Sequence, residues 1–150
     1  MIVLPNSIED QMIAHARALF PIECCGYLAG TVEADGVHVK ALYKMTNLDQ
    51  KEDHFTFDPK EQFSVVKDAR AKGLSLVSVY HSHPYTPSRL STEDLALLVD
   101  PNMIYFIVSL EFQDNPVVNA FQTKDNQSVD VMVKRVRDSL IQATEKRLMA

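Results

Sequence analysis

The pattern of apolar positions along the chain changes period several times, and each change marks an expected element. The first segment carries apolar residues on one face at helical spacing, namely Ile8, Met12, Ala16 and Leu19. Ser7 is suited to cap this helix, and Pro21 lies just past its end. The chain therefore begins with a predicted amphipathic helix.

Two β-rich runs follow, at 26–33 and 37–46, and Asp35-Gly36 separates them. An Asp-Gly pair between such runs predicts a tight hairpin. Residues 47–53 are polar and predict a loop, and Phe55-Thr56-Phe57 is expected to form a short extended piece.

The middle of the chain predicts two helices and three strands. Asp58 as cap, Pro59 at the first position and Gly73 at the end predict a helix between them. The remaining expected elements are a buried strand at 74–80, a short helix at 91–99, and a strand pair at 103–110 and 117–123.

The last segment gives conflicting signals. Val129, Val131 and Val133 alternate as in a strand, whereas Val133, Val136 and Leu140 suit a helix. We expect a brief strand followed by a carboxy-terminal helix. The sequence does not decide whether residues 129–133 form a strand or a helix. No linker or repeat divides the chain, so 1–150 is expected to form one domain, a mixed sheet flanked by helices.

Composition narrows the class of partner. The net charge is −5, and no run of Lys or Arg exceeds two residues, which argues against nucleic acid as a partner. No unbroken apolar stretch approaches about 18 residues, and no targeting signal is evident, so a cytoplasmic protein is expected. Cys24 and Cys25 are adjacent, with Cα atoms about 3.8 Å apart, too close for an ordinary disulfide, and are expected to be packing residues.

The segment that carries chemistry follows the predicted strand at 74–80. It contains His81-Ser82-His83-Pro84, with Ser91 and Asp94 further on. Because side chains alternate along a strand, His81 and His83 point to one side and can converge on a metal ion. Asp94 can complete a set of three ligands, which leaves a fourth tetrahedral position for water, as in catalytic zinc sites. The alternative is structural: two polar strand-end histidines, and a Ser-x-x-Asp pair that only caps a helix.

These residues resemble the JAMM, or MPN-plus, zinc metallopeptidases. The family signature is an upstream Glu, then His-x-His-Pro, a Ser separated from the second His by seven residues, and an Asp three beyond that Ser. His83, Ser91 and Asp94 have this spacing, and the segment at 21–30 around Glu23 is similar to the upstream element. The resemblance runs from Ser7 to about Thr123.

The resemblance implies both a fold and a set of roles. The expected fold is α/β, with a curved, mostly antiparallel sheet like that of cytidine deaminases. One zinc ion per chain would be bound by His81, His83 and Asp94 with a water molecule. Glu23 would be the general base, and Ser91 would stabilise the oxyanion.

Other functions and substrates compete with this one. Deamination is disfavoured because the chain lacks His-x-Glu and Cys-x-x-Cys. A non-catalytic MPN scaffold is the second candidate. The short stand-alone members suggest a ubiquitin-like sulfur-carrier tail as substrate, whereas a small cell-wall-type peptide is the other option. Such a tail would add beside Phe55, Thr56 and Phe57. The sequence does not distinguish a peptide bond from an isopeptide bond, and it leaves the oligomeric state open.

Overall fold

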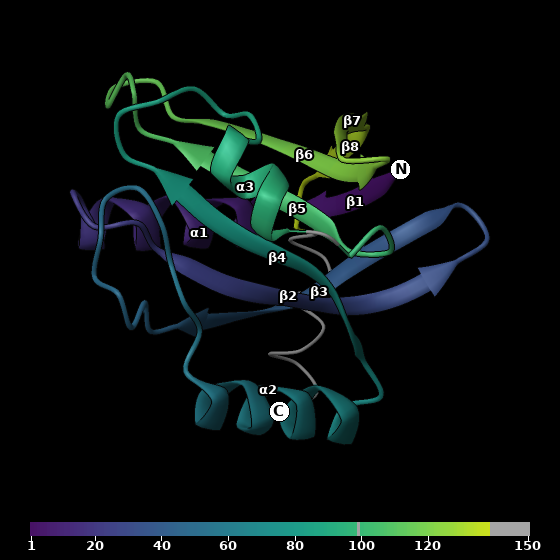
Figure 1. The fold of residues 1–150 in the computed structure, drawn as a ribbon. Helices are drawn as coiled ribbons and strands as arrows, with labels where there is room; N and C mark the ends of the chain where they lie inside the picture. The colour runs from purple at the N-terminus through teal and green to yellow at the C-terminus, as the bar shows by residue number, and fades with distance from the viewer. Residues whose placement is uncertain (99, 139–150) are drawn as a thin grey trace.

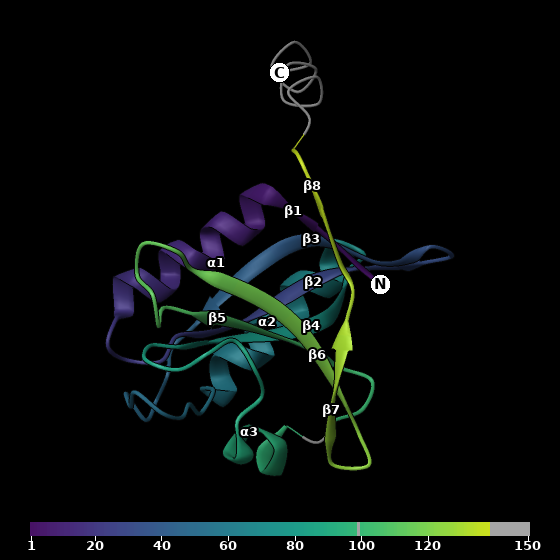
Figure 2. The ribbon, with the colours of Figure 1, turned by 90° about the horizontal axis from the view of Figure 1, so that it is seen from above.

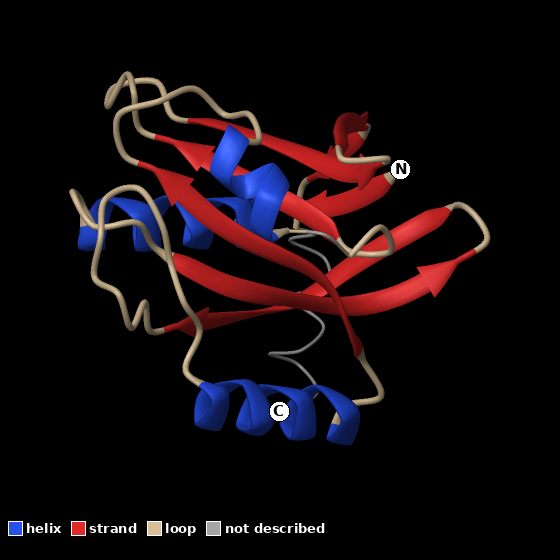
Figure 3. Ribbon diagram, in the orientation of Figure 1, coloured by secondary structure: helices blue, strands red, loops and turns tan. Residues whose placement is uncertain are grey.

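A computed structural model describes residues 1–98 and 100–138 of the chain. In these residues, eight strands form one sheet in the order β7-β6-β5-β4-β2-β3-β1-β8 (Figures 1 and 3). The strands are β1 (Ile2–Pro5), β2 (Cys25–Glu33), β3 (Gly36–Met45), β4 (Ser75–His83), β5 (Ile104–Ser109), β6 (Val117–Lys124), β7 (Gln127–Val131) and β8 (Val133–Val136). The helices are α1 (Asn6–Leu19), α2 (Pro59–Ala71) and α3 (Thr92–Leu97).

The sheet is mixed and mostly antiparallel, as expected. Strand β2 pairs antiparallel with both β3 and β4, and β6 does so with β5 and β7. The pairs β4–β5, β1–β3 and β1–β8 are parallel. A parallel pair needs a crossover between its strands. For β4 and β5 this crossover contains α3, which brings that helix to the end of β4.

The sheet is strongly curved. Strands β7 and β8 lie at its two edges, yet Met132 alone separates them in the chain, so the edges approach each other (Figure 2). The Ile2 N–H donates to the Met132 carbonyl oxygen at 2.9 Å, and Arg135 in β8 donates to the carbonyl oxygen of Val118 in β6. These two bonds link the ends of the curved sheet.

Helices α1 and α2 pack on opposite faces of the sheet. The larger apolar cluster joins Ile8, Met12 and Ala16 of α1 to sheet residues that include Leu28 and Phe106. On the other face, Val65 of α2 joins a cluster that includes Cys25 and Met45. Both cysteines are buried and free, which confirms that they are packing residues.

A close approach between β2 and β4 sets the position of the end of β4. A Cβ atom on Gly26 would lie 2.3 Å from the Tyr80 ring and 2.4 Å from the Tyr43 carbonyl oxygen. Only glycine therefore fits at this position. The register pairs Gly26 with Tyr80 and Cys25 with His81.

The predicted start of α1 is wrong by two residues. Pro5 occupies the N-cap position and makes no side-chain cap bond, and the helix begins at Asn6. Ser7 lies inside the first turn and donates through its N–H and its hydroxyl to the Asp138 carboxylate. The hairpin between β2 and β3 is confirmed, but its turn residues are Ala34 and Asp35, because Gly36 pairs with Glu33 and begins β3. The cap at Asp58 is confirmed.

The carboxy-terminal segment also differs from the prediction. Residues 129–131 belong to β7, and Val133–Val136 is β8, so the helical spacing of Val133 and Val136 does not form a helix. Pairing with β1 decides this, because Ile2 and Val133 are partners in the sheet. The rest of the expected terminal helix, 139–150, lies outside the described residues. Among the helices described, none is long and apolar enough to cross a membrane.

Candidate metal centre

The two histidines of the motif lie at the end of strand β4. Strand β4 extends to His83, further than the expected end at residue 80, and pairs in parallel with β5. His81 and His83 are buried and point to the same side, so that their Nε2 atoms are 3.2 Å apart. Ser82 points the other way, and its hydroxyl oxygen accepts from the Cys24 N–H at 2.8 Å. The expected alternation is confirmed.

The loop after β4 returns the chain so that α3 begins beside the histidines. Ser91 is the N-cap of α3, and its hydroxyl oxygen accepts from the Asp94 N–H at 3.0 Å. Asp94 Oδ2 accepts from the Ser91 N–H at 3.0 Å, which completes a capping box. The same oxygen lies 3.2 Å from His81 Nε2 and 3.0 Å from His83 Nε2. Asp94 therefore caps the helix and also meets both imidazoles.

The hydrogen bonds of His83 decide which of its nitrogens carries a proton. Its Nδ1 atom lies 2.9 Å from the Pro87 carbonyl oxygen, which can only accept, so Nδ1 is the donor. In the neutral ring, Nε2 then carries a lone pair. That lone pair faces Asp94 Oδ2, another acceptor. Two acceptors at 3.0 Å need a cation between them or a second proton on the ring.

The spacing of the three atoms fits a metal ion. His81, His83 and Asp94 offer one ligand atom each, and the three atoms are 3.0–3.2 Å apart. Zinc bonds of about 2.0–2.1 Å in tetrahedral geometry place ligand atoms about 3.3 Å from one another. The nitrogen, nitrogen and oxygen donor set is also one that zinc accepts in catalytic sites. The residues present therefore fit a zinc ion.

Burial controls the direction of the pKa shift of His81, whereas hydrogen bonds control that of Asp94. Burial lowers the pKa of His81, and its hydrogen bond with Asp94 only partly opposes this. Burial alone would raise the pKa of Asp94, but hydrogen bonds with His81 and His83 hold it well below its usual range. The cluster thus favours a neutral His81 and an ionised Asp94, which are the forms that ligate metal.

Glu23 lies beside the three atoms. It follows α1, and its N–H donates to the Lys51 carbonyl oxygen at 2.8 Å. Its side chain is 2% exposed, and Oε1 lies 3.9 Å from His81 Nε2 with no hydrogen-bond partner in the described residues. Burial raises the pKa of Glu23 to about 9, and Asp94, Asp53 and Glu93 add to the rise. A buried carboxyl oxygen without a partner, aimed at the cluster, also fits a site that receives a ligand or water.

The cluster opens into a cleft of about 520 Å³. Glu23, His83 and Ser91 line it, so the structure brings together all five residues that the motif predicts. The other lining residues are Glu52, Asp53, Tyr85, Thr86, Arg89, Thr92 and Glu93.

Phe55, Thr56 and Phe57 lie beside this cleft but do not line it. The ring of Phe55 is 5.0 Å from that of His81 and 5.3 Å from that of Phe57. The Thr56 N–H and carbonyl are used within the loop, by Asn47 Oδ1 and the Leu48 N–H. A single bridge joins Phe57 to Asn47, so the expected extended piece is not a full strand.

Asn47 is a buried residue of this region that the sequence did not single out. Its Nδ2 group donates to the carbonyl oxygens of Glu23 and His54, each at 3.0 Å. Its Oδ1 atom accepts from the backbone N–H groups of Asp49 and Thr56. These four bonds tie the loop that carries the acidic cleft residues to the backbone of Glu23. A lone Asn before a polar loop gives no sequence signal for this role.

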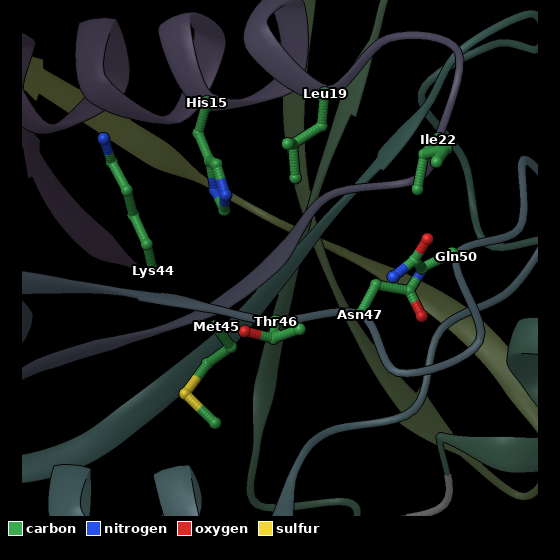
Figure 4. A pocket seen from close by; sticks show the side chains of 8 residues that line it. All are labelled: His15, Leu19, Ile22, Lys44, Met45, Thr46, Asn47 and Gln50. Carbon is green, nitrogen blue, oxygen red and sulfur yellow. The ribbon is translucent and has the colours of Figure 1, made fainter.

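A second hollow, of about 470 Å³, lies between α1 and the end of β3 (Figure 4). His15, Leu19 and Ile22 face Lys44 and Met45 across it in that view. His15 Nδ1 lies 2.8 Å from the Tyr80 hydroxyl, and burial lowers the pKa of His15 to about 4, with Lys44 adding to the shift. None of the predicted site residues lines this hollow.

Comparison with known proteins identifies the family of the chain. The family described as prokaryotic homologues of the JAB domain matches residues 5–124. The chain belongs to the prokaryotic JAB-domain family. This JAB domain is 31% identical over 109 residues to the proteins named CysO-cysteine peptidase from Mycobacterium tuberculosis and Mycobacterium bovis, covering 73% of each chain.

Solved structures give the same fold for this JAB domain. A protein from Desulfitobacterium hafniense matches with a TM-score of 0.85 and 38% identity, over 94% of this chain and 97% of the other. A protein from Salinibacter ruber matches with a TM-score of 0.68 and 30% identity, over 91% and 92% of the two chains. A JAB1/MPN domain protein from Archaeoglobus fulgidus shares the fold, with a TM-score of 0.60 at 18% identity over 91% and 99%.

Proposed function

We propose that this JAB domain is a zinc-dependent peptidase that hydrolyses an amide bond at the carboxy-terminal tail of a ubiquitin-like sulfur-carrier protein. The observation that carries the metal is the set of three buried ligand atoms spaced 3.0–3.2 Å apart, with the His83 lone pair facing Asp94. The substrate class is supported by the name of the mycobacterial relatives, CysO-cysteine peptidase.

His81, His83 and Asp94 would hold the zinc ion. When bound, zinc polarises the scissile carbonyl and lowers the pKa of water from about 15.7 to about 7. The protein fixes the ligands from outside the cluster, because the Pro87 carbonyl orients His83 and the Ser91 N–H orients Asp94. The site is therefore preorganised for the ion.

Glu23 moves the proton in this proposal. Its unpartnered Oε1 atom is within reach of a water molecule placed next to His81. The water oxygen forms a bond to the carbonyl carbon while Glu23 accepts a proton, and the carbon–nitrogen bond then breaks as Glu23 returns that proton to the leaving nitrogen. The products are a carboxylate and an amine, so water is the one co-reactant.

Ser91 would stabilise the oxyanion. Its hydroxyl oxygen already accepts from the Asp94 N–H, which leaves the hydroxyl hydrogen for a donor bond into the cleft. A donor of this kind typically contributes about 2.7–4 kcal/mol to the transition state.

The carrier tail would run past the loop at 55–57. The backbone groups of Thr56 are used inside the loop, whereas no hydrogen bond in the described residues uses the backbone of Phe55 or Phe57. A Gly-Gly tail can pair with them and reach the cluster beside the Phe55 ring. Because Thr56→Pro would also break the loop bond to Asn47, N-methylated tail glycines are a cleaner test. We expect methylation of a paired glycine to lower cleavage; equal rates contradict this pairing.

The decisive experiment is mass spectrometry of an extended carrier. A sulfur-carrier protein with one residue added after its Gly-Gly end is incubated with zinc-loaded protein, with Glu23→Gln and with chelator-treated protein. We expect loss of the added residue with the first protein alone. Intact carrier in every reaction, together with no bound zinc, would favour the scaffold function. Equal cleavage of a free Gly-Gly-Ala peptide would favour the small-peptide substrate.

A further inference from the structure

The cleft at the metal centre contains one basic side chain. Arg89 is the one lysine or arginine among its lining residues, and Glu52, Asp53 and Glu93 line the same cleft. In the part of the chain that the structure describes, no ion pair within 4.0 Å involves Arg89. Two of the nearby acids lie close to His54, whose Nδ1 atom is 2.9 Å from Asp53 and 4.0 Å from Glu93. An arginine left unpaired among carboxylates is available to an anion from outside.

The backbone on both sides of Arg89 is held in place. The Ser88 hydroxyl donates to the Ile107 carbonyl oxygen at 2.7 Å, and its oxygen accepts from the Asn119 N–H at 3.1 Å. Leu90 is buried in the cluster formed with β4 and β5. The Arg89 N–H donates to the Pro87 carbonyl oxygen at 3.0 Å. Arg89 is thus an exposed side chain on a loop whose backbone is held by the sheet, and binding residues are often carried on loops that a rigid scaffold positions.

The position of Arg89 assigns it to one side of the reaction. The loop at 55–57, proposed to receive the tail, contacts the metal centre at His81 through Phe55. Arg89 belongs to the loop that contacts it at His83 through Pro87. When the tail lies along the loop at 55–57, the acyl side of the scissile bond faces Phe55 and the leaving group faces Arg89.

We propose that Arg89 binds the free α-carboxylate of a leaving amino acid, so that the protein removes a single carboxy-terminal residue. The carboxylate of such a residue is two bonds from the scissile nitrogen, within reach of a guanidinium in the same cleft, and a planar guanidinium binds it in a bidentate manner. A lysine side chain joined through its ε-nitrogen has no carboxylate at that distance. This inference rests on the proposed function and narrows it to a peptide bond before the last residue.

The test compares paired peptides that differ only at the terminus. Two peptides ending in Gly-Gly-Ala, one with a free carboxylate and one amidated, are assayed for kcat/KM with zinc-loaded wild type, Arg89→Gln and Arg89→Lys. Alanine avoids a thiol that would itself bind zinc. We expect wild type to prefer the free acid by about tenfold, and this ratio to fall to near one in Arg89→Gln. Arg89→Lys should keep part of the preference, because it keeps the charge but not the planar fork.

A binding measurement separates this inference from the proposed function. The Kd of each peptide is measured by calorimetry on Glu23→Gln and on Glu23→Gln/Arg89→Gln, where turnover is not required. Arg70→Gln, an exposed arginine in α2 outside the cleft, is the matched control and should keep the wild-type ratio. If wild type does not cleave, but the free acid binds more tightly than the amide and this difference depends on Arg89, the peptidase function is wrong and the carboxylate site is supported. Equal binding and cleavage of acid and amide, or a ratio that persists in Arg89→Gln, overturns the role of Arg89.

Discussion

Asp94 Oδ2 accepts a hydrogen bond from the Ser91 N–H at 3.0 Å and is the same atom that meets both motif histidines. The helix cap and the metal ligand are therefore one oxygen. This arrangement fixes the ligand through the start of α3, and changes at either residue should affect the metal and the helix to different extents.

Asp94→Asn should separate these two roles. The amide oxygen can still accept from the Ser91 N–H, but the negative charge that pairs with the ion is lost. Residues that only orient a ligand typically change metal affinity by about 10–100-fold, so we expect a larger loss here. Zinc content after dialysis, with circular dichroism as a check of folding, measures the effect. Glu93→Gln, next to it in α3, is the control and should retain zinc; full zinc in Asp94→Asn would remove Asp94 from the ligand set.

Ser91→Ala should lower kcat more than it lowers stability. Loss of the oxyanion donor is expected to reduce kcat by about 100-fold, and loss of the cap acceptor to reduce the free energy of unfolding by about 1 kcal/mol. Ser91→Thr keeps the hydroxyl and should recover most of both. Steady-state kinetics and urea unfolding test this. An unchanged kcat in Ser91→Ala would leave Ser91 as a helix cap alone.

Zinc binding should release a proton from Glu23. Burial raises the pKa of Glu23 to about 9, so the carboxyl is protonated at neutral pH in the metal-free protein. A divalent cation beside it favours the charged form and lowers that pKa. Calorimetry in buffers of different ionisation enthalpy counts the protons released. Glu23→Gln should release about one proton fewer near pH 7. The same count in both proteins would mean that Glu23 is already ionised.

Asn47→Ala should loosen the loop that borders the cleft. Four hydrogen bonds are lost, including the bond to the Glu23 carbonyl oxygen, and buried partners are left unpaired. We expect a loss of about 2–4 kcal/mol in the free energy of unfolding, with a lower kcat. Asn102→Ala, at an exposed position, should change stability by less than about 0.5 kcal/mol. Similar values for both variants would contradict the role of Asn47.

His15 should make the protein less stable in mild acid. Its pKa is lowered to about 4 in the folded protein, against 6.5 as its ordinary value, so the unfolded chain binds the proton more readily. Stability is then lost as the pH falls below about 6.5 and continues to fall to about 4, by about 1.4 kcal/mol per unit at most. His15→Gln cannot titrate, and it should lose less stability than wild type between about pH 6.5 and pH 4.5. Parallel curves in urea unfolding would show that His15 is not responsible.

Local sequence patterns predicted much of the fold. The β2–β3 hairpin, with its turn one residue earlier than expected, and the cap at Asp58 are confirmed, because a turn and a helix start depend on a few adjacent residues. Strand β1 and strand β8 were not predicted. Each has four residues, and both become strands through parallel pairing, β1 with β3 and β8, and β8 with β1; these long-range contacts are contained in no local pattern.

The candidate site shows the same division. Sequence spacing alone was enough to group His81, His83 and Asp94, because a strand alternates its side chains and a short loop returns the next helix. The loop at 84–90 decided the His83 tautomer and brought Arg89 into the cleft, and the loop after β3 holds the backbone of the buried Glu23 through Lys51 and Asn47. Residue types and their spacing determine which groups are available, whereas burial and the choice of hydrogen-bond partner depend on segments that meet only in the folded chain.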